Sequence, residues 1–477
     1  MAKQRMLQFV NVDRDMPEKR PPNLRAQDFG EIYAEYATAK AEEQAGRCSQ
    51  CGVPYCQSHC PLHNNIPDWL RMTAEGRLQE AYEISQATNT FPEICGRICP
   101  QDRLCEGNCV IEQSGHGTVT IGAVEKYITD TAWENGWVKP AAPKVERPES
   151  VGIIGAGPGG LAAADMLRRQ GVQVTVYDRY DRAGGLLTYG IPGFKLEKDV
   201  VMKRVDQLEQ GGVTFKMNCN VGEDVSFAEL QNTHDAILIA TGVYKSRDLP
   251  APGVGAQGIV RAIDFLTASN RKSFGDAVPE FDSGELNAEG KRVVVIGGGD
   301  TAMDCLRTSI RQGATSVKCL YRRDKANMPG SQREVANAEE EGVEFVWLSA
   351  PKGFAGDTVE GVMVSKMRLG APDASGRQSP EIIEGADYVE DADLVIMALG
   401  FEPEALPTLW DVPELEVTRW GTVKADFRTH ETSLKGVYAC GDIQRGASLV
   451  VWAIRDGREA AEAIMDQINA AAQVAAE

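Results

Sequence analysis

Short apolar runs alternate with longer amphipathic segments in the part of the chain that follows residue 149. The runs are rich in Val, Ile and Leu, as expected for strands that are buried on both faces of a sheet. We predict strands at residues 150–154, 173–177, 236–240, 292–296, 316–321, 393–399 and 436–439. Because helical segments separate these strands, the pattern predicts an α/β fold with parallel sheets. Two of the strands lead directly into glycine-rich turns, so a nucleotide-binding unit is expected twice.

The first part of the chain has a different pattern. Residues 28–47, DFGEIYAEYATAKAEEQAGR, place Ile32 and Tyr36 on one face of a predicted helix, and residues 121–136 have a similar character. The segment KPAAPKVERPES at 139–150 is rich in proline and charge. Such a segment cannot build a packed element, and it predicts a linker. We therefore expect a first domain of helices and loops, followed by the α/β region.

Composition limits the class of protein further. The 477 residues are enough for several domains, and 50 Lys and Arg against 69 Asp and Glu give a formal charge of −19. This charge repels a phosphate backbone and argues against general nucleic-acid binding. The opening stretch MAKQRMLQFVNVDRD mixes charged and apolar residues. We therefore expect neither a secretory signal nor a membrane anchor, and we expect a cytoplasmic protein.

Eight of the twelve cysteines lie between residues 48 and 109. They form the runs C-x2-C-x4-C-x3-C-P and C-x3-C-P-x4-C-x3-C, made by Cys48, Cys51, Cys56, Cys60, Cys95, Cys99, Cys105 and Cys109. Such compact runs resemble the thiolate ligands of two-cluster ferredoxins, and eight thiolates suffice for two 4Fe–4S clusters. The alternative is two structural zinc sites of four cysteines each. Disulfides are disfavoured because the expected compartment is reducing.

The first glycine-rich turn follows a predicted strand and reads GAGPGG. Gly155 permits a tight turn, Gly157 lets a pyrophosphate approach the backbone, and Gly160 allows the helix to pack closely on the strand. The helix that follows offers free N–H groups to phosphates. Asp178 ends the next strand, where a carboxylate can accept hydrogen bonds from an unphosphorylated ribose. These features together predict a dinucleotide site.

The second turn reads IGGGDTA, with Gly297, Gly299 and Ala302 at the three glycine positions of the dinucleotide pattern. Here the following strand ends in Arg322 and Arg323 instead of an acid. Guanidinium groups can hydrogen-bond a ribose 2′-phosphate, which an acid would repel, so the pattern favours NADP(H) over NAD(H). The alternative interpretation is that both arginines form a solvated strand end.

The segment GVYACGD near the C-terminal end predicts a strand that delivers Gly441 and Asp442 to the start of a helix from about residue 448. An aspartate at this place can hydrogen-bond the ribityl hydroxyls of a flavin, and the positive end of the helix can face the isoalloxazine ring. On its own, the segment is equally compatible with an ordinary strand–loop–helix unit.

Seven segments match the motifs of one family in order: RCSQCGVPYCQSHCPLHNNIPDW, NTFPEICGRICPQDRLCEGNC, GAGPGGLAAA, GGLLTYGIPGFKLEK, VVVIGGGDTAMD, YRRD and YACGD. Over nearly its whole length the chain resembles the small (beta) subunit of bacterial NADPH-dependent glutamate synthase. The segment at 184–198 is far more specific than any glycine-rich turn. The same module resembles part of dihydropyrimidine dehydrogenase and several NADPH:acceptor electron-transfer subunits.

The resemblance implies a helical domain at 1–146 with two 4Fe–4S clusters, an FAD domain made from 147–258 and 401–477, and an NADPH domain at 259–400. The nucleotide domains are expected to be Rossmann-like, of the glutathione-reductase and adrenodoxin-reductase type. The resemblance further implies that one cluster is held by Cys48, Cys51, Cys56 and Cys109, and the other by Cys60, Cys95, Cys99 and Cys105. The residues expected to contact FAD are Gly155, Ala156, Gly157, Pro158, Gly160, Asp178, Arg179, Gly185, Leu186, Thr241, Gly242, Gly441 and Asp442. Those expected to contact NADPH are Gly297, Gly298, Gly299, Asp300, Thr301, Ala302, Arg322 and Arg323.

The implied activity is oxidation of NADPH at FAD, with electrons passed singly through the clusters to a large (alpha) subunit that makes L-glutamate from glutamine and 2-oxoglutarate. A heterodimer or larger hetero-oligomer is therefore expected. The cofactors carry this chemistry, so we assign no catalytic residue. The chain begins Met1–Ala2, without the N-terminal cysteine nucleophile of glutamine amidotransferases, so glutamate synthesis by this chain alone is not expected.

Two alternatives stay open from the sequence. The first is an NADPH:acceptor flavoprotein subunit that reduces a ferredoxin or serves another oxidoreductase. The second is a zinc-stabilised interaction protein whose nucleotide-binding domains are regulatory.

Overall fold

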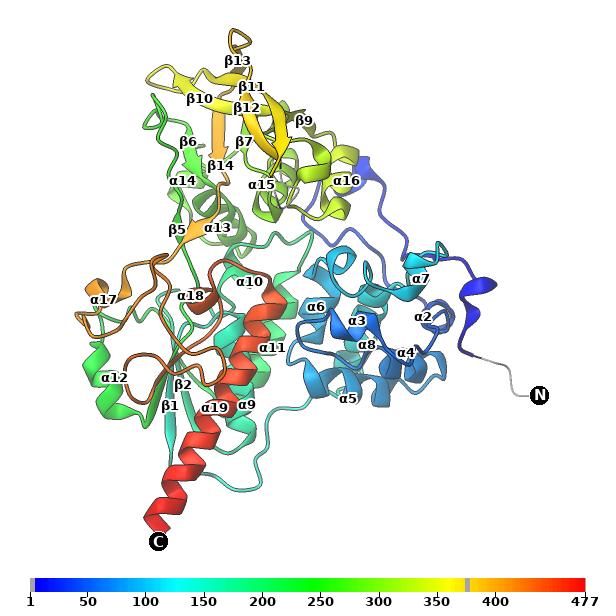
Figure 1. The fold of residues 1–477 in the computed structure, drawn as a ribbon, viewed down its shortest axis with the longest axis vertical. Coiled ribbons are helices and arrows are strands. Elements are labelled where there is room, and N and C mark those ends of the chain that lie inside the picture. Colours follow the sequence, from blue (N-terminus) through cyan, green and yellow to red (C-terminus); the bar gives the residue numbers. More distant parts are fainter. Residues whose placement is uncertain (1–4, 374–377, 477) are drawn as a thin grey trace.

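Two five-stranded parallel sheets carry the second part of the chain in the computed structural model, which describes residues 5–373 and 378–476 (Figure 1). Met1 and Ala2 lie outside the described residues. The first sheet has the order β16-β4-β1-β2-β3. Its strands are β1 (Ser150–Ile154), β2 (Gln173–Tyr177), β3 (Thr214–Lys216), β4 (Ala236–Ile239) and β16 (Val437–Ala439). Because β16 comes from the C-terminal part of the chain, this sheet is built from two separate segments.

The second sheet has the order β6-β14-β7-β8-β9, and its strands are also parallel. They are β6 (Ile259–Arg261), β7 (Arg292–Ile296), β8 (Ser316–Tyr321), β9 (Glu344–Trp347) and β14 (Leu394–Met397). Every run that the sequence analysis predicts as a strand contains one of the strands of these two sheets. The prediction of a parallel α/β architecture is therefore confirmed.

Helices cover the two sheets. Helix α9 (Pro158–Arg169) follows β1, and α15 (Asp300–Arg311) follows β7, so each glycine-rich turn opens a helix as predicted. The long α19 (Val450–Ala476), red in Figure 1, packs along α9. The remaining helices of this part are α10 (Leu186–Tyr189), α11 (Lys198–Gln210), α12 (Phe227–Thr233), α13 (Ala262–Ser273), α14 (Pro279–Asp282), α16 (Gln332–Glu340), α17 (Leu406–Leu409) and α18 (Asp442–Arg445). None of the helices in the described ranges is both long and apolar enough to cross a bilayer.

The sequence analysis missed an antiparallel sheet beside the second parallel sheet. It consists of β10 (Ser349–Ala355), β11 (Gly361–Pro372), β12 (Gln378–Ile382) and β13 (Tyr388–Asp391). Val362 and Val364 pack against Val294 and Ile296. The other faces of β12 and β13 are partly exposed, so these strands have no continuous apolar run by which they can be recognised. Two short strands, β5 (Lys245–Ser246) and β15 (Phe401–Glu402), pair with each other. They lie on the two chain segments that run between the parallel sheets.

The first part of the chain is made of short helices, at the right of Figure 1. They are α1 (Pro22–Arg25), α2 (Thr38–Ala45), α3 (Tyr55–Ser58), α4 (Ile66–Ala74), α5 (Leu78–Thr88), α6 (Pro92–Ile98), α7 (Val110–Gln113) and α8 (Ile121–Glu134). The helix predicted at 28–47 is wrong in its first half, since residues 28–37 are not helical. Ile32 pairs through its carbonyl with the Arg20 N–H, and the Tyr36 hydroxyl donates to the Asp15 carbonyl at 2.6 Å. Contacts with an earlier segment thus override the local helical pattern.

Buried ion pairs join the three parts of the molecule. Glu341 accepts hydrogen bonds from Arg25 of the helical part at 2.8 Å and from Arg307 and Arg311 of α15 at 2.8 and 2.6 Å. The guanidinium groups of Arg307 and Arg311 also lie over the ring of Phe194, which precedes α11. Burial alone raises the pKa of Glu341, but the hydrogen bonds from Arg307 and Arg311 lower it to about 2. The carboxylate therefore stays charged and holds all three arginines.

Candidate cofactor and dinucleotide sites

A cavity of about 340 Å³ opens where the β1–α9 turn meets the start of α19. Gly155 has φ +112°, and a Cβ there would meet the Ala240 carbonyl oxygen at 2.3 Å. A Cβ at Gly160 would meet the Gly155 oxygen at 2.1 Å, so only glycine lets α9 pack this closely. At Gly157, in contrast, a Cβ would meet no atom within 4 Å. The backbone at Gly157 faces open space, which fits the approach of a pyrophosphate group.

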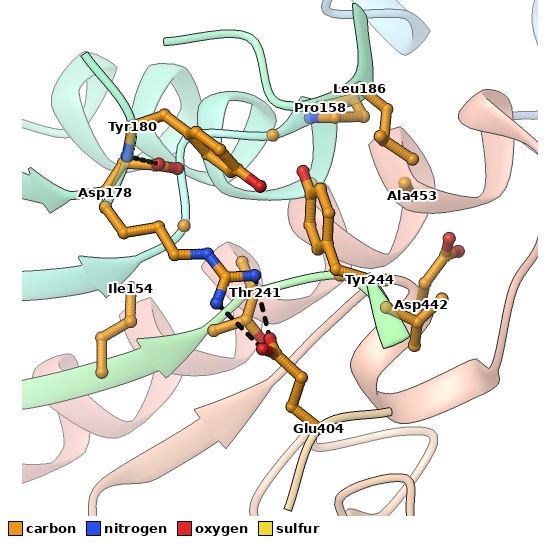
Figure 2. Close-up of a pocket in the computed structure, with 18 of the residues that line it drawn as sticks. Ile154, Pro158, Asp178, Tyr180, Leu186, Thr241, Tyr244, Glu404, Asp442 and Ala453 are labelled. Carbon is orange, nitrogen blue, oxygen red and sulfur yellow. Dashed lines mark hydrogen bonds and ion pairs between the residues drawn. The ribbon is translucent and has the colours of Figure 1, made fainter. Parts of the chain in front are cut away.

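Asp178 lies at the end of β2 and lines this cavity (Figure 2). Its carboxylate accepts hydrogen bonds from the Ala156 N–H at 2.7 Å and the Tyr180 N–H at 2.9 Å. Burial raises the pKa of Asp178, while these two backbone bonds lower it and offset part of the effect. The side chain thus fixes the glycine-rich turn in place. Its predicted contact with a ribose stays a prediction.

Most of the remaining residues predicted to contact FAD surround the same space, although Ala156, Gly160 and Gly185 do not line it. Pro158, Arg179, Leu186, Thr241, Gly242, Gly441 and Asp442 line the cavity. The hydroxyl oxygen of Thr241 is buried without a hydrogen-bond partner in the described residues, which leaves a polar group available to a ligand. Gly185, at φ +54°, packs so closely that a Cβ would meet the Gly157 Cα at 2.9 Å. The two predicted glycine segments therefore touch.

Asp442 and the start of α19 form the far side of the cavity. The Asp442 carboxylate accepts hydrogen bonds from the Ser448 N–H at 3.1 Å and the Ser448 hydroxyl at 2.7 Å. Burial raises the pKa of Asp442 to about 6. Leu449, Val450 and Ala453 line the cavity, so the N-terminal end of the helix faces it. This end carries partial positive charge, as the prediction of a flavin site requires.

Tyr180, Tyr244 and Glu404 are among the cavity-lining residues that sequence reasoning missed. Tyr180 and Tyr244 face one another with ring centroids 5.9 Å apart, and Glu404 binds both terminal nitrogens of Arg179 at 2.9 Å (Figure 2). Burial raises the pKa of Tyr244 well above its ordinary value. No motif spacing marks these positions, and Glu404 comes from the chain segment that returns from the second sheet. Only their position in the fold connects them with the cavity.

The turn between β7 and α15 repeats the geometry of the first turn. Gly297 has φ +146°, and a Cβ there would meet the Ala398 carbonyl oxygen at 2.3 Å, whereas Gly299 faces open space. A Cβ at Gly298 would meet the ring of Tyr321 at 2.4 Å. Ala302 is fully buried at the third position. The second turn is therefore built like a dinucleotide site as well.

A cleft of about 490 Å³ extends from the second turn to the first cavity. Gly299, Asp300 and Thr301 line one part of it, and Leu186 and Asp442 belong to both the cleft and the first cavity. The helical part of the chain supplies another wall, with residues that include Tyr33, Arg97 and Cys99. A dinucleotide held at the second turn can therefore extend toward a group held in the first cavity.

Arg322 and Arg323 lie at the end of β8, beside this second turn. Arg322 is exposed and Arg323 is half-buried, and neither lines the cleft. Neither takes part in an ion pair with another described residue, and the Nε of Arg323 is buried without a partner. Both guanidinium groups are available to an anion. Their predicted contact with a 2′-phosphate stays a prediction.

The eight clustered cysteines line two small cavities in the helical part. Cys48, Cys51, Cys56 and Cys109 line one, and Cys60, Cys95, Cys99 and Cys105 line the other. These are the same two groups of four that the resemblance implies. Ile121 belongs to both linings, so the cavities are neighbours. The second cysteine cavity, of Cys60, Cys95, Cys99 and Cys105, is also lined by Val451. The residue before it, Val450, lines the first cavity, where FAD is predicted to bind.

The chemistry of the thiols bears on which metal centre they could hold. Burial raises the pKa of Cys48 to about 11 and those of Cys56 and Cys60 to about 12, so metal binding must displace protons from them. Among the residues that the structure describes, no three Cys, His, Asp or Glu side chains are arranged to hold a single metal ion. A zinc ion requires its four sulfur ligands at about 2.3 Å. Each set of four thiols lines one small cavity, and such a donor set suits a 4Fe–4S cluster or a zinc ion.

Two protein families match the chain. The family described as dihydropyrimidine dehydrogenase domain II, 4Fe-4S cluster, matches residues 25–137, and the pyridine nucleotide-disulphide oxidoreductase family matches residues 149–457. The glutamate synthase (NADPH) small chain of Azospirillum brasilense is 66% identical over 474 residues, which cover 99% of this chain and 98% of that protein. The chain belongs to the glutamate synthase small chain family.

Other members and relatives of the glutamate synthase small chain family define its breadth. The glutamate synthase (NADPH) small chain of Escherichia coli is 46% identical and covers 98% of this chain and 99% of its own length. The putative oxidoreductase AegA of the same organism is 45% identical over 96% of this chain but only 70% of its own length. FprA from Mycobacterium tuberculosis in complex with NADPH has the same fold, with a TM-score of 0.58 at 21% identity, over 69% of this chain and 86% of that chain.

Gly157 provides a test of the first cavity as a flavin site. Replacing it by alanine adds a methyl group that meets no protein atom, so the fold should persist, but the group fills the space in which a pyrophosphate approaches the backbone. We expect Gly157→Ala to purify with at least tenfold less flavin, by absorbance, and with an unchanged circular dichroism spectrum. Gly255→Ala is the matched control, because this exposed glycine also has free space around it. Full flavin content in Gly157→Ala would contradict the assignment.

Proposed function

We propose that this chain oxidises NADPH and delivers the electrons to a separate large subunit, which makes L-glutamate from glutamine and 2-oxoglutarate. The family supports the reaction, and the observation that carries it is the cleft that joins the second glycine turn to the first cavity. When bound, FAD accepts two electrons as a hydride and releases them singly, and the 4Fe–4S clusters carry one electron at a time.

The residues of the chain have binding and positioning roles in this proposal. The first cavity would hold FAD, with Gly157 at the pyrophosphate, Thr241 and Asp442 as polar contacts, and the start of α19 near the ring. The second turn would hold NADPH, with Arg322 and Arg323 at the 2′-phosphate. The two groups of four cysteines would each hold one cluster. This assignment keeps the predicted division into 1–146, 147–258 with 401–477, and 259–400.

No side chain of the chain is needed as an acid, base or nucleophile in the proposed reaction. The walls of the cleft instead orient the dinucleotide toward the first cavity, because two different parts of the chain line it. Leu186 and Val450 line both the first cavity and the cleft, so they lie where the FAD and NADPH sites meet. The protein thus contributes mainly position.

A second candidate function is electron delivery to another oxidoreductase. The similarity to AegA favours it, because that protein contains a region like this chain within a longer protein. Both candidates share the same NADPH oxidation and differ only in the acceptor.

The experiment that tests the proposal uses the purified chain under anaerobic conditions. We expect bound flavin, iron and sulfide, with visible absorbance that NADPH bleaches, and NADPH-dependent reduction of ferricyanide. Glutamine and 2-oxoglutarate should yield no glutamate until the large subunit is added. A colourless protein, or glutamate formed by the isolated chain, would refute the proposal.

The two arginines after β8 should determine the preference for NADPH. Arg322→Ala together with Arg323→Ala removes charge-assisted hydrogen bonds worth about 1.5–3 kcal/mol each. We expect the Kd of NADPH to rise at least tenfold and that of NADH to change less than twofold, measured by titration calorimetry. Lys325→Ala is the control for local charge, since Lys325 is exposed and pairs with Glu339. An equal loss for both dinucleotides would contradict the 2′-phosphate assignment.

The partner is proposed to dock where the first cysteine cavity approaches the surface. Three apolar side chains are exposed there: Val53 by 65%, Tyr55 by 46% and Val110 by 36%. Tyr55 and Val110 line the cavity of Cys48, Cys51, Cys56 and Cys109. Exposed apolar groups of this kind mark interaction surfaces, and electron transfer needs the acceptor close to the donor. The large subunit is the occupant that the proposed reaction requires.

Val53→Asp tests this surface without touching a cavity-lining residue. An exposed charge should not disturb the fold or the reduction of ferricyanide, but it should weaken the apolar contact with the large subunit. We expect glutamate formation at limiting large subunit to fall at least fivefold. Val389→Asp is the matched control, because Val389 is 58% exposed on the antiparallel sheet. Equal effects of the two substitutions would exclude this surface as the docking site.

A further inference from the structure

Arg333 crosses from the dinucleotide-binding part to the helical part of the molecule. It lies in the first turn of α16, and its Nη2 donates to the carbonyl oxygen of Cys99 at 3.4 Å. Two neighbouring contacts join the same segments: Arg103 donates to the Pro329 carbonyl at 2.6 Å, and the Ser331 hydroxyl donates to Asp102 at 3.1 Å. Residues 329–333 therefore dock on the loop that begins at Cys99.

The charge of Arg333 has no direct counter-charge among the described residues. Its Nε is buried without a hydrogen-bond partner, and its guanidinium takes part in none of the ion pairs of the described chain. Two acids that act on it have cationic partners of their own, since Glu334 pairs with Arg307 at 2.6 Å and Glu106 with Arg14 at 3.2 Å. A third, Asp102, accepts a hydrogen bond from the Ser331 hydroxyl. Burial lowers the pKa of Arg333, but the field of these acids raises it more, so the guanidinium stays protonated.

Arg333 is half-buried, and a cation withdrawn from water in this way costs free energy unless an anion compensates for it. Arg333 lines the cleft, where a dinucleotide phosphate is one possible anion. Among the described residues, however, its guanidinium donates only to the carbonyl oxygen of Cys99, one of the four cysteines around the second cysteine cavity. Four thiolates around a 4Fe–4S core keep a net negative charge, and each accepted electron adds one further negative charge without releasing a group.

We propose that Arg333 is the counter-charge of the iron–sulfur cluster at the second cysteine cavity and raises the reduction potential of that cluster. This inference rests on the proposed function, which places a cluster there. A positive charge in a medium of low dielectric constant stabilises the reduced, more negative form. Because Arg333 belongs to the dinucleotide-binding part, one structural unit tunes a redox centre held entirely by another.

The test compares Arg333→Gln, which removes the charge, with Arg333→Lys, which keeps it. Anaerobic redox titration followed by electron paramagnetic resonance should show that Arg333→Gln lowers the midpoint potential of one cluster and leaves the other unchanged. Arg333→Lys should restore most of that potential. Arg103→Gln is the control, because Arg103 is exposed and makes a hydrogen bond across the same contact. It should shift neither potential. The Kd of NADP⁺ is measured in all three variants, because Arg333 and Arg103 line the cleft.

The outcomes separate this inference from the proposed function. Wild-type protein without iron would refute the cluster itself, and the inference with it. Two unshifted potentials in an iron-replete Arg333→Gln variant, or a shift of the same size in Arg103→Gln, would overturn the inference alone. A weaker affinity of Arg333→Gln for NADP⁺ with unchanged potentials would show instead that Arg333 serves the dinucleotide. If Arg333→Gln fails to retain iron, the Arg333→Lys variant decides. A lowered cluster potential in Arg333→Lys would then overturn the inference.

Discussion

The carboxylate of Glu341 is the interaction on which the arrangement of the molecule depends. It binds three arginines from two parts of the chain, and two of these arginines stack on Phe194 from a third part. Loss of one partner from such a buried network leaves uncompensated charge, at a cost of about 3–5 kcal/mol. Electron transfer needs fixed, short separations between cofactors. A network that ties all three parts together is therefore a condition for the proposed reaction, although it touches no cofactor site.

The two glycine-rich turns show how one backbone geometry serves two ligands. Gly155 and Gly297 both press against the carbonyl of a neighbouring strand, and Gly157 and Gly299 both face open space. The difference lies one strand further on. Asp178 accepts a hydrogen bond from the backbone of its own turn, while Arg322 and Arg323 pair with no carboxylate in the part of the chain that the structure describes. The fold provides two similar glycine-rich turns, and the residues at the end of the following strand determine which dinucleotide each turn selects.

The sequence predicts those features that depend on neighbours in the chain. Seven of the ten strands of the parallel sheets, both turns and the start of α19 follow from local apolar runs and glycine spacing, whereas β3, β6 and β9 were not predicted. The features it did not predict depend on distant contacts. Tyr244 and Glu404 meet in one cavity only because the chain returns from the second sheet, and residues 28–37 are held by an earlier segment instead of by their own helical pattern. The antiparallel sheet has strands too exposed to produce an apolar run.

The cysteine loop links cofactor binding to the placement of the domains. The thiols are buried and their pKa values are raised, so a metal centre that binds here must displace their protons. Cys99 belongs to this group, and the residues that follow it carry the contact with segment 329–333. With a cluster bound, the loop that begins at Cys99 is held by its cysteine ligand and by the contacts with residues 329–333 of the dinucleotide-binding part. Assembly of the proposed clusters should therefore also order the cleft in which NADPH binds, because one short loop forms a wall of both sites.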